Sequence, residues 1–500
     1  MDSGSIAPPK ERIDGWLLRI AGVVVLGVVM STLDTTVVSI ALPTFEQEFN
    51  TSYAVAAWTM TGYALALATV IPLTGWASDR FGTKRLYLHA LVLFVSGSVL
   101  CSIAGNIAAL IAFRILQGIG GGILMPLGMT ILTRSAGPAR LGRLMSILGI
   151  PMLLAPIAGP ALSGWIIEFF SWHWIFLINL PMGLLALITA NAVLPADAPR
   201  RTESFDFAGL MLLSPGVTVL LYGVSSIPEV GSVIAPRVMA PMLMGIALIA
   251  FFVRHAFVFP KPLIDLSLFK NLQLTTAVIT LFLFTVAFYG GMLLIPSYFL
   301  QVRGESTLSV GTLMLPHGLG AIVTMPIAGR LADKTAAGRV ILPGLLLIAL
   351  GMGVLTQVGA GTSYPLLLGA LATMGMGMGA TMMPITTTAL QSLTDRMVAR
   401  GSTLLNIVQQ VANSVGTAVM SVVLTNQLAR SNPSETTIFP HEDESLATNA
   451  QPDTPSIWAD QAGFAFAASF TVAFALILLA CIAALFLPYR KRHVAPKERP

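Results

Sequence analysis

The first apolar stretch of the chain reads WLLRIAGVVVLGVVMSTLDTTVVSIALP from Trp16 to Pro43, and it contains one acid, Asp34. A helix that crosses a bilayer needs about 20 mainly apolar residues, so this stretch is long enough. The apolar core of a cleavable signal peptide is shorter and has no acid inside it. We therefore expect the stretch to remain in the protein as its first membrane span.

Stretches of this kind recur from one end of the chain to the other. Of the 500 residues, 55% are hydrophobic and 10% are charged, and the mean hydropathy is +0.81. Ordinary globular chains are about 45–50% apolar and about 25% charged, so the composition excludes a soluble enzyme and predicts an all-α integral membrane protein. We predict fourteen spans, at residues 16–42, 54–78, 86–104, 108–133, 144–168, 172–194, 207–226, 234–253, 271–300, 308–332, 340–358, 364–390, 401–425 and 463–488.

The basic residues predict how these spans are oriented. Because the number of spans is even, both termini lie on one side of the membrane. Of the 28 lysines and arginines, 24 lie on that side, in loops, tails or span ends, and the other four are Arg237, Arg303 and Arg430 on the opposite side and Arg114 well inside a span. Loops rich in Lys and Arg stay in the cytoplasm, so we expect cytoplasmic termini. The net charge of +5 then reflects topology, and we expect no nucleic-acid partner.

Two further features suggest no chemistry of their own. Cys101 and Cys481 lie in apolar stretches and are expected to be packing thiols. The longest polar stretch, 426–462, is predicted to be a poorly ordered external loop. Its run from His441 to Glu444 places one histidine beside adjacent acids, which does not define a metal geometry. We expect neither a metal nor another cofactor.

Two loops on the cytoplasmic side carry related sequences. GWASDRFGTKR (Gly75 to Arg85) follows the second predicted span, and GRLADKTAAGR (Gly329 to Arg339) follows the tenth. Both have a glycine, then an acid and a base, and a basic end, which indicates two related halves. Because the loops are eight spans apart, two helices have been inserted between six-span halves. The predicted organisation is a tail (1–15), a first bundle (16–194), a linker with two inserted helices (195–270), a second bundle (271–488, with the external loop) and a second tail (489–500).

At this point the chain resembles the major facilitator superfamily, and in particular its fourteen-span drug/proton antiporter branch. The resemblance runs along nearly the whole chain. It is carried by LDTTVVSIALP (Leu33 to Pro43), the loop from Gly75 to Arg85, RILQGIGGG (Arg114 to Gly122), GIPMLLAPIAGPALSG (Gly149 to Gly164) and WHWIFLINLP (Trp172 to Pro181). Two departures from the family pattern are Ser39, where asparagine is usual, and His173, where arginine is expected. The resemblance implies two six-helix bundles plus two inserted helices, and export driven by the proton gradient.

Asp34 and Arg114 are the only acid and the only base well inside a predicted span. At about 1.5 Å per residue, Asp34 lies roughly 13 Å from the external end of its span and Arg114 roughly 9 Å from the external end of its own. The two charges are thus at similar depth, where pairing would offset the cost of desolvating them. We hypothesise that protonation of Asp34 releases Arg114 and drives the outward-to-inward change; a static structural pair is the alternative.

Two other motifs suggest parts that move. The loop residues Gly75, Asp79, Arg80, Gly82 and Arg85, with Asp333 in the second copy, are expected to form a cytoplasmic gate in which Asp79 binds a neighbouring helix end; charge that serves topology alone is the alternative. In the fifth span, glycines and prolines permit close helix approach and kinks, either for packing alone or to seal one face during transport. These residues are Gly149, Pro156, Gly159, Pro160 and Gly164.

A substrate cavity is expected near the midplane between the halves. Methionine, aromatic and amide side chains suit varied apolar ligands. The residues expected to line it are Met60, Tyr63, Gln117, Phe288, Tyr289, Met292, Tyr298, His317, Gln409 and Asn413. His317 is expected to be a hydrogen-bonded core or pore-lining residue, and a second titrating site is the alternative.

These observations favour a monomeric, multi-pass protein of the cytoplasmic (inner) membrane that exports lipophilic or amphipathic drugs, including cations, in exchange for protons. A second hypothesis is export of one native metabolite, lipid or siderophore, with drug efflux incidental. A membrane-embedded enzyme would need clustered catalytic groups at depth, and only Asp34 and Arg114 qualify.

Overall fold

The computed structural model describes residues 14–137, 140–145, 149, 159, 162–163, 165–195, 205–230, 234–260, 262–394, 397–431 and 454–487. Within these ranges the regular structure is helical, with no strand. Thirteen segments among them are long and apolar enough to cross a membrane. The predicted span at 144–168 falls largely outside the described residues, so the other thirteen predicted spans are the ones that can be compared.

Each of those thirteen predicted spans coincides with a helix or a pair of helices. The helices are α1 (Gly15–Glu48), α2 (Tyr53–Phe81), α3 (Thr83–Ser102), α4 (Ile107–Ala136), α6 (His173–Leu177), α7 (Asn179–Val193), α8 (Phe207–Ser225), α9 (Ile227–Val230), α10 (Pro236–Val258), the 3-10 helix η1 (Leu266–Lys270), α11 (Leu272–Gln301), α12 (Thr307–Leu313), α13 (Leu315–Lys334), α14 (Gly338–Leu355), α15 (Tyr364–Gln391), α16 (Val398–Ser431) and α17 (Thr454–Ala484). The pairs α6 with α7 and α12 with α13 each form one span.

The helix ends follow from local sequence signals. Asn106 begins α4 because its side chain accepts a hydrogen bond from the backbone N–H of Ala109 at 2.8 Å, which satisfies a donor that the first turn leaves free. Gly82 ends α2 and precedes α3 with φ +86°, a conformation that L side chains rarely adopt. The chain can therefore reverse between two long helices with a single residue.

The predicted external loop is shorter than the sequence indicated. Helix α16 continues to Ser431 and α17 already begins at Thr454, so both ends of the stretch 426–462 are helical. Polar residues at these ends do not stop a helix, because its backbone hydrogen bonds are made within the segment. The run from His441 to Glu444 lies outside the described residues.

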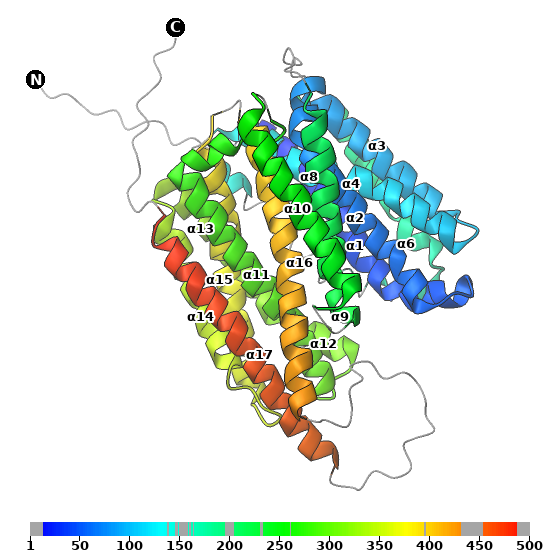
Figure 1. Cartoon of the computed structure of the whole chain (residues 1–500), viewed down its shortest axis with the longest axis vertical. Helices are drawn as coiled ribbons and strands as arrows, with labels where there is room; N and C mark the ends of the chain where they lie inside the picture. The colour runs from blue at the N-terminus through cyan, green and yellow to red at the C-terminus, as the bar shows by residue number, and fades with distance from the viewer. Residues whose placement is uncertain are drawn as a thin grey trace, which may run out of the picture.

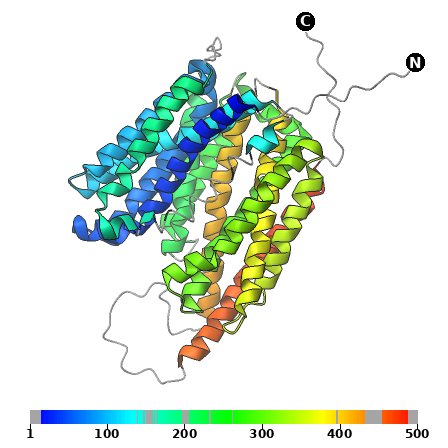
Figure 2. The ribbon, with the colours of Figure 1, turned by 180° about the vertical axis from the view of Figure 1, so that it is seen from behind.

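The two halves have the same internal packing. In the first half, α4 packs against both α2 and α3; in the second half, α15 packs against both α13 and α14. Figure 1 shows the first half, in blue and cyan, beside the second half, in green to red, and Figure 2 shows the same division from behind. This arrangement is what two copies of one six-helix unit would produce, as the related loop sequences suggest.

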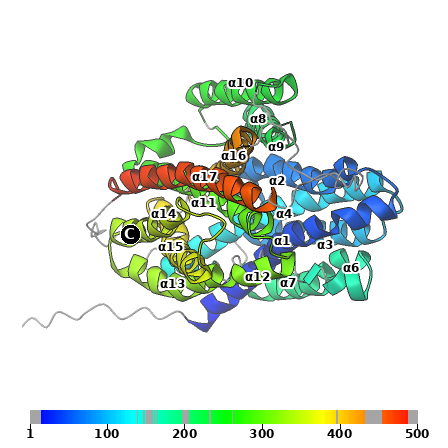
Figure 3. The same cartoon turned by 90° about the horizontal axis from the view of Figure 1, so that it is seen from below.

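The inserted helices lie at the edge of the molecule. Helix α10 packs mainly against α8, and α8 packs against α2 of the first half and α16 of the second. Figure 3 shows α10 at the periphery, with α8 between it and the rest of the bundle. The outer face of α10 exposes large apolar side chains, including Leu243, Phe251 and Phe257, as expected for a helix in contact with lipid.

Candidate functional site

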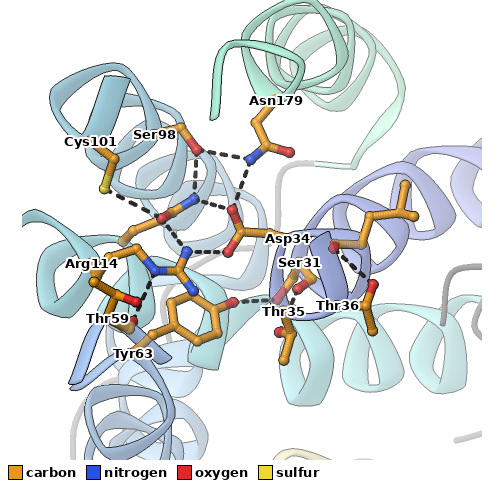
Figure 4. Close-up of polar contacts among 12 residues, drawn as sticks. Ser31, Asp34, Thr35, Thr36, Thr59, Tyr63, Ser98, Cys101, Arg114 and Asn179 are labelled. Atoms are coloured by element: carbon orange, nitrogen blue, oxygen red, sulfur yellow. Dashed lines mark hydrogen bonds and ion pairs between the residues drawn. The ribbon is translucent and has the colours of Figure 1, made fainter. Parts of the chain in front are cut away.

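Asp34 lies at the centre of a buried polar network in the first half (Figure 4). Its side chain forms an ion pair with Arg114, and neither side chain is exposed. Asp34 comes from α1 and Arg114 from α4, so the pair joins the two helices whose depths were matched from the sequence. The structure thus brings together the only acid and the only base that the sequence places well inside its predicted spans.

The second oxygen of Asp34 is held by two amides. Asp34 Oδ1 accepts a hydrogen bond of 2.8 Å from Gln117 and one of 3.0 Å from Asn179. Both amides also donate to the hydroxyl of Ser98, at 2.6 and 3.0 Å. The carboxylate therefore accepts hydrogen bonds from side chains of α4 and α7, and Ser98 of α3 holds the two amides in place.

Arg114 has a similarly specific environment. Its Nε donates to the carbonyl oxygen of Thr59 at 3.1 Å, and its Nη1 donates to Gln117 at 2.7 Å as well as to Asp34. The guanidinium lies 4.2 Å from the centroid of the Tyr63 ring, a cation–π contact. Its Nη2 is buried and has no hydrogen-bond partner among the described residues.

This arrangement makes the protonation state of Asp34 important for stability. Removing one partner of a buried ion pair costs about 3–5 kcal/mol because the other charge is left unpaired. Protonation of Asp34 has the same electrostatic effect, since Arg114 then has no counter-charge among the donors and acceptors around it.

Sequence reasoning assigned no role to three of the polar residues in this network. Ser98, Thr59 and Asn179 each lie in an apolar span, where a single small polar residue is common. Asn179 falls within the quoted motif from Trp172 to Pro181, so the motif marked its segment without revealing its contact. The carbonyl of Thr59 is a backbone group and leaves no signal in the sequence.

Two adjoining cavities lie beside the network. The first has a volume of about 190 Å³ and is lined by Thr35, Met60, Thr61, Tyr63, Ala64, Leu65, Arg114, Leu221, Ser225, Gln410 and Ser414. The second, of about 260 Å³, is lined by residues of both halves, including Tyr289, Gln409 and Asn413. Because Thr35 and Gln410 line both, the cavities adjoin between the halves, near the ion pair.

Five of the ten expected cavity residues line these walls: Met60, Tyr63, Tyr289, Gln409 and Asn413. The structure does not place the other five there. Gln117 belongs to the Asp34 network, and Met292 packs against the hydrophobic core. Tyr298 is 2% exposed and donates to the carbonyl oxygen of Gly359 at 2.8 Å, so it contacts the turn between α14 and α15.

Phe288 and His317 pack against each other in the second half. Their ring centroids are 5.7 Å apart, and both side chains are buried. The Nε2 of His317 has no hydrogen-bond partner among the described residues, contrary to the expectation of a hydrogen-bonded histidine. Spacing along a helix identifies which residues share a face, but which face meets the cavity depends on the neighbouring helices.

The loop between α2 and α3 closes against both halves. Asp79 accepts a hydrogen bond of 2.9 Å from Arg134, which lies in the last turn of α4. Gly75 packs against α16: a Cβ added there would lie 3.1 Å from Thr403 Oγ1 and 3.4 Å from the backbone of Arg400. The side chains of Arg80 and Arg85 are exposed. Asp79 thus binds a neighbouring helix end in its own half, and Gly75 makes the contact between the halves.

The second copy of the loop makes a matching contact, from the second half to the first. Asp333 is 8% exposed, and its carboxylate accepts hydrogen bonds from the backbone N–H of Gly142 at 2.8 Å and of Arg143 at 3.2 Å. Arg143 Nε also donates to it at 3.0 Å. A Cβ at Gly142 would lie 2.7 Å from the carbonyl oxygen of Gly329. Each loop copy therefore packs against the other half, and the two halves meet at the end of the bundle that carries these loops.

Part of the fifth predicted span is described, and its glycines permit close contact. A Cβ at Gly149 would lie 2.5 Å from Met325 Cε in α13, and a Cβ at Gly159 would collide with Thr36 Oγ1 in α1. Thr36 is two residues from Asp34, so this segment contacts α1 next to the ion pair. Pro156, Pro160 and Gly164 lie outside the described residues.

Metal chemistry has no support from the part of the chain that the structure describes. No group of three or more His, Cys, Asp or Glu residues there is arranged to hold a metal ion. The site is therefore a buried ion pair beside a cavity between two halves that meet at one end.

Comparison with known proteins agrees with this architecture. Residues 24–417 match the sequence profile of the Major Facilitator Superfamily. The chain belongs to the major facilitator superfamily. Major facilitator proteins are membrane transporters, so this chain is a multi-pass transporter and not an enzyme.

Two curated relatives and one solved structure illustrate the match to the superfamily. A multidrug resistance protein B homolog of Mycobacterium tuberculosis is 46% identical over 495 residues, covering 96% of this chain and 91% of the relative. The uncharacterized MFS-type transporter YhcA of Bacillus subtilis is 32% identical over 426 residues, covering 84% and 79%. A double-tryptophan variant of XylE has 16% sequence identity and a TM-score of 0.65, covering 96% of this chain and 97% of that one. The last comparison supports the fold alone.

Proposed function

We propose that this transporter is a proton-coupled antiporter that exports lipophilic or amphipathic compounds across the cytoplasmic membrane by alternating access. The observation that carries the proposal is the buried Asp34–Arg114 pair beside a cavity that both halves line. The name of the Mycobacterium tuberculosis relative, a multidrug resistance protein, supports drugs as substrates. The proton gradient is the proposed energy source.

The proposed cycle starts from the arrangement seen here, in which the halves meet at the loop end. A proton that reaches Asp34 neutralises it, which removes the counter-charge of Arg114 and destabilises this arrangement. The loop contacts at Gly75 and Gly142 then separate, and the cavity becomes accessible from the cytoplasm. Substrate entering the cavity next to Arg114 favours release of the proton and return to the first state.

The cavity walls favour some substrates over others. In the described part of the chain, Arg114 is the one charged side chain on the cavity walls. Both oxygens of Asp34 already accept hydrogen bonds, which come from Arg114, Gln117 and Asn179. Neutral amphipathic molecules fit this state. A cation would be attracted only after the ion pair has separated.

Proton release on addition of candidate substrates to purified protein tests the coupling. Wild-type protein should release protons on binding a drug at a pH at which Asp34 is protonated in part of the population, and Asp34→Asn should release none. Asp34→Glu keeps a titrating carboxyl at the same position and serves as the matched control. If Asp34→Asn still exported a drug uphill on a proton gradient, the proposed role of Asp34 would be wrong.

Export of one native metabolite, lipid or siderophore is the competing proposal. A substrate panel in everted vesicles separates the two, because a drug exporter would transport several unrelated compounds at comparable rates. A protein dedicated to one metabolite would show a large preference for a single chemical class.

A further inference from the structure

One wall of the cavity beside Arg114 belongs to neither half of the repeat. Leu221 and Ser225 of α8 line this cavity together with residues of α1, α2, α4 and α16. Helix α8 is one of the two inserted helices, and it lies between α2 and α16 at the edge of the molecule (Figure 3). Without α8, the cavity would open between α2 and α16 toward the surrounding lipid.

Helix α8 is attached to the first half by specific contacts. The hydroxyl groups of Thr69 in α2 and Thr218 in α8 are hydrogen-bonded at 2.7 Å. Farther along, Trp58 of α2 stacks on Tyr222 of α8 with ring centroids 6.1 Å apart. These two contacts hold α8 to α2 at two levels, so α8 is expected to move with the first half.

The contact between α8 and α16 has a different character. Val224 of α8 and Ala418 of α16 belong to one small buried cluster of apolar side chains. Among the residues that the structure describes, no hydrogen bond joins α8 to α16. Apolar surfaces inside a bilayer separate at low cost, because lipid tails replace the lost contacts.

The cavity wall suits an amphipathic molecule. Thr61, Gln410 and Ser414 offer hydroxyl and amide groups, whereas Met60 and Leu221 offer apolar surface. Met60 and Thr61 lie near the external end of α2, and Leu221 belongs to the wall formed by α8. Gln410 and Ser414 of α16 are the exceptions. The cavity therefore lies in the half of the membrane away from the loops of the gate.

We propose that the seam between α8 and α16 is a lateral portal, through which an amphipathic molecule passes between the Arg114 cavity and the bilayer leaflet on the external side. The portal rests on the proposed export function and specifies its route. Substrate leaves into lipid, and α8 acts as the movable wall that retains substrate until the halves rearrange.

Crosslinking of the seam tests this route. In the full-length protein, Val224→Cys with Ala418→Cys would be joined by a short, reducible bifunctional thiol reagent, and Ser225→Cys with Ser414→Cys provides a second pair across the same seam. Thr69→Cys with Thr218→Cys joins α8 to α2 and is the matched control. Wild-type protein treated with the reagent controls for the native cysteines, which are buried.

Two probes separate the lipid route from an aqueous route. One is a neutral nitrobenzoxadiazole dye with a dodecyl chain, which partitions into the bilayer, and the other is the same dye with an ethyl chain. Proteoliposomes with an imposed proton gradient eject the dyes, and dithionite reports the dye on the outer side. If the seam is the portal, crosslinking it should slow ejection of the dodecyl dye at least about tenfold. Ejection of the ethyl dye should slow less than about twofold. Reduction of the crosslink should restore the ejection rate of the dodecyl dye.

The control pair should leave ejection of both dyes within about twofold of the unreacted protein. Equal block of both dyes by a crosslinked seam would show that the crosslink stops the rocking motion, and it would overturn the portal. So would unchanged ejection of the dodecyl dye, or a block by the α2–α8 crosslink. Ejection by unreacted protein tests the proposed export itself, so the two proposals fail in different measurements.

Discussion

Neutralising Asp34 is expected to open the gate end of the protein, which is linked to Asp34 through the packing of α1, α2 and α4. Asp34→Asn keeps one acceptor oxygen for the amides of Gln117 and Asn179 but removes the negative charge beside Arg114. Loss of one partner of a buried pair costs about 3–5 kcal/mol. A conformational equilibrium shifts about tenfold for each 1.4 kcal/mol.

If half of that cost, about 1.5–2.5 kcal/mol, falls on the arrangement closed at the loop end, the open arrangement gains at least about tenfold in population. Thr403 reports this change, because it is 1% exposed and faces Gly75 across the contact between the halves. Thr403→Cys should react slowly with a thiol reagent in the parent protein. Combined with Asp34→Asn, it should react at least about tenfold faster.

Two controls make the measurement specific. Asp34→Glu keeps the charge, so Thr403→Cys should react at about the parent rate. Combining Asp34→Asn with Arg114→Gln removes both charges, so most of the effect should disappear. Cys481 in α17 is 8% exposed, and its continued slow reaction excludes general unfolding. Equal labelling rates for Thr403→Cys in the parent and in the Asp34→Asn background would refute the coupling between the ion pair and the gate.

Three other outcomes are expected from the same structure. Gly142→Ala should weaken closure at the loop end and raise substrate leakage, because its Cβ would lie 2.6 Å from Asp333 Oδ1. The control is Gly369→Ala, whose Cβ meets nothing within 4 Å and which should transport normally in the same vesicle assay. Gly82→Ala should lower the free energy of unfolding by about 1–3 kcal/mol, because φ is +86° and ψ is 150° there, a backbone conformation essentially restricted to glycine; an unchanged unfolding temperature would contradict this. Asp206→Ala should loosen the inserted helices and raise the rate of proteolysis between α8 and α10, because the Asp206 carboxylate accepts hydrogen bonds from α8, α10 and the chain before η1. Equal rates of proteolysis for the variant and the wild type would count against this prediction.

The position of the helices could be predicted well from the sequence because apolar length is a local property. The thirteen spans that can be compared agree with the predicted ones to within a few residues at most ends. The exceptions are α1, α16 and α17, which continue into polar sequence. Hydropathy reports where a helix is in lipid, and it does not report where a helix ends in water.

The site was predicted in part for the same reason. A lone acid and a lone base stand out in apolar spans, and their depths follow from the rise of a helix. Ser98 and Asn179 do not stand out, since small polar residues are common in such spans. Half of the expected cavity residues face elsewhere, because a methionine or an aromatic ring is equally suited to a cavity wall and to a packed core.

The sequence by itself determined that the chain crosses the membrane repeatedly and that Asp34 and Arg114 lie at similar depth, and it predicted two related halves. These conclusions depend on composition, spacing along the chain and the cost of charge in hydrocarbon. The tertiary structure decided which partners hold the carboxylate, which side chains face the cavity and that α8 closes its lateral wall. Such contacts join residues as far apart as Asp34 and Asn179, and they depend on how whole helices rotate against one another, which no local pattern specifies.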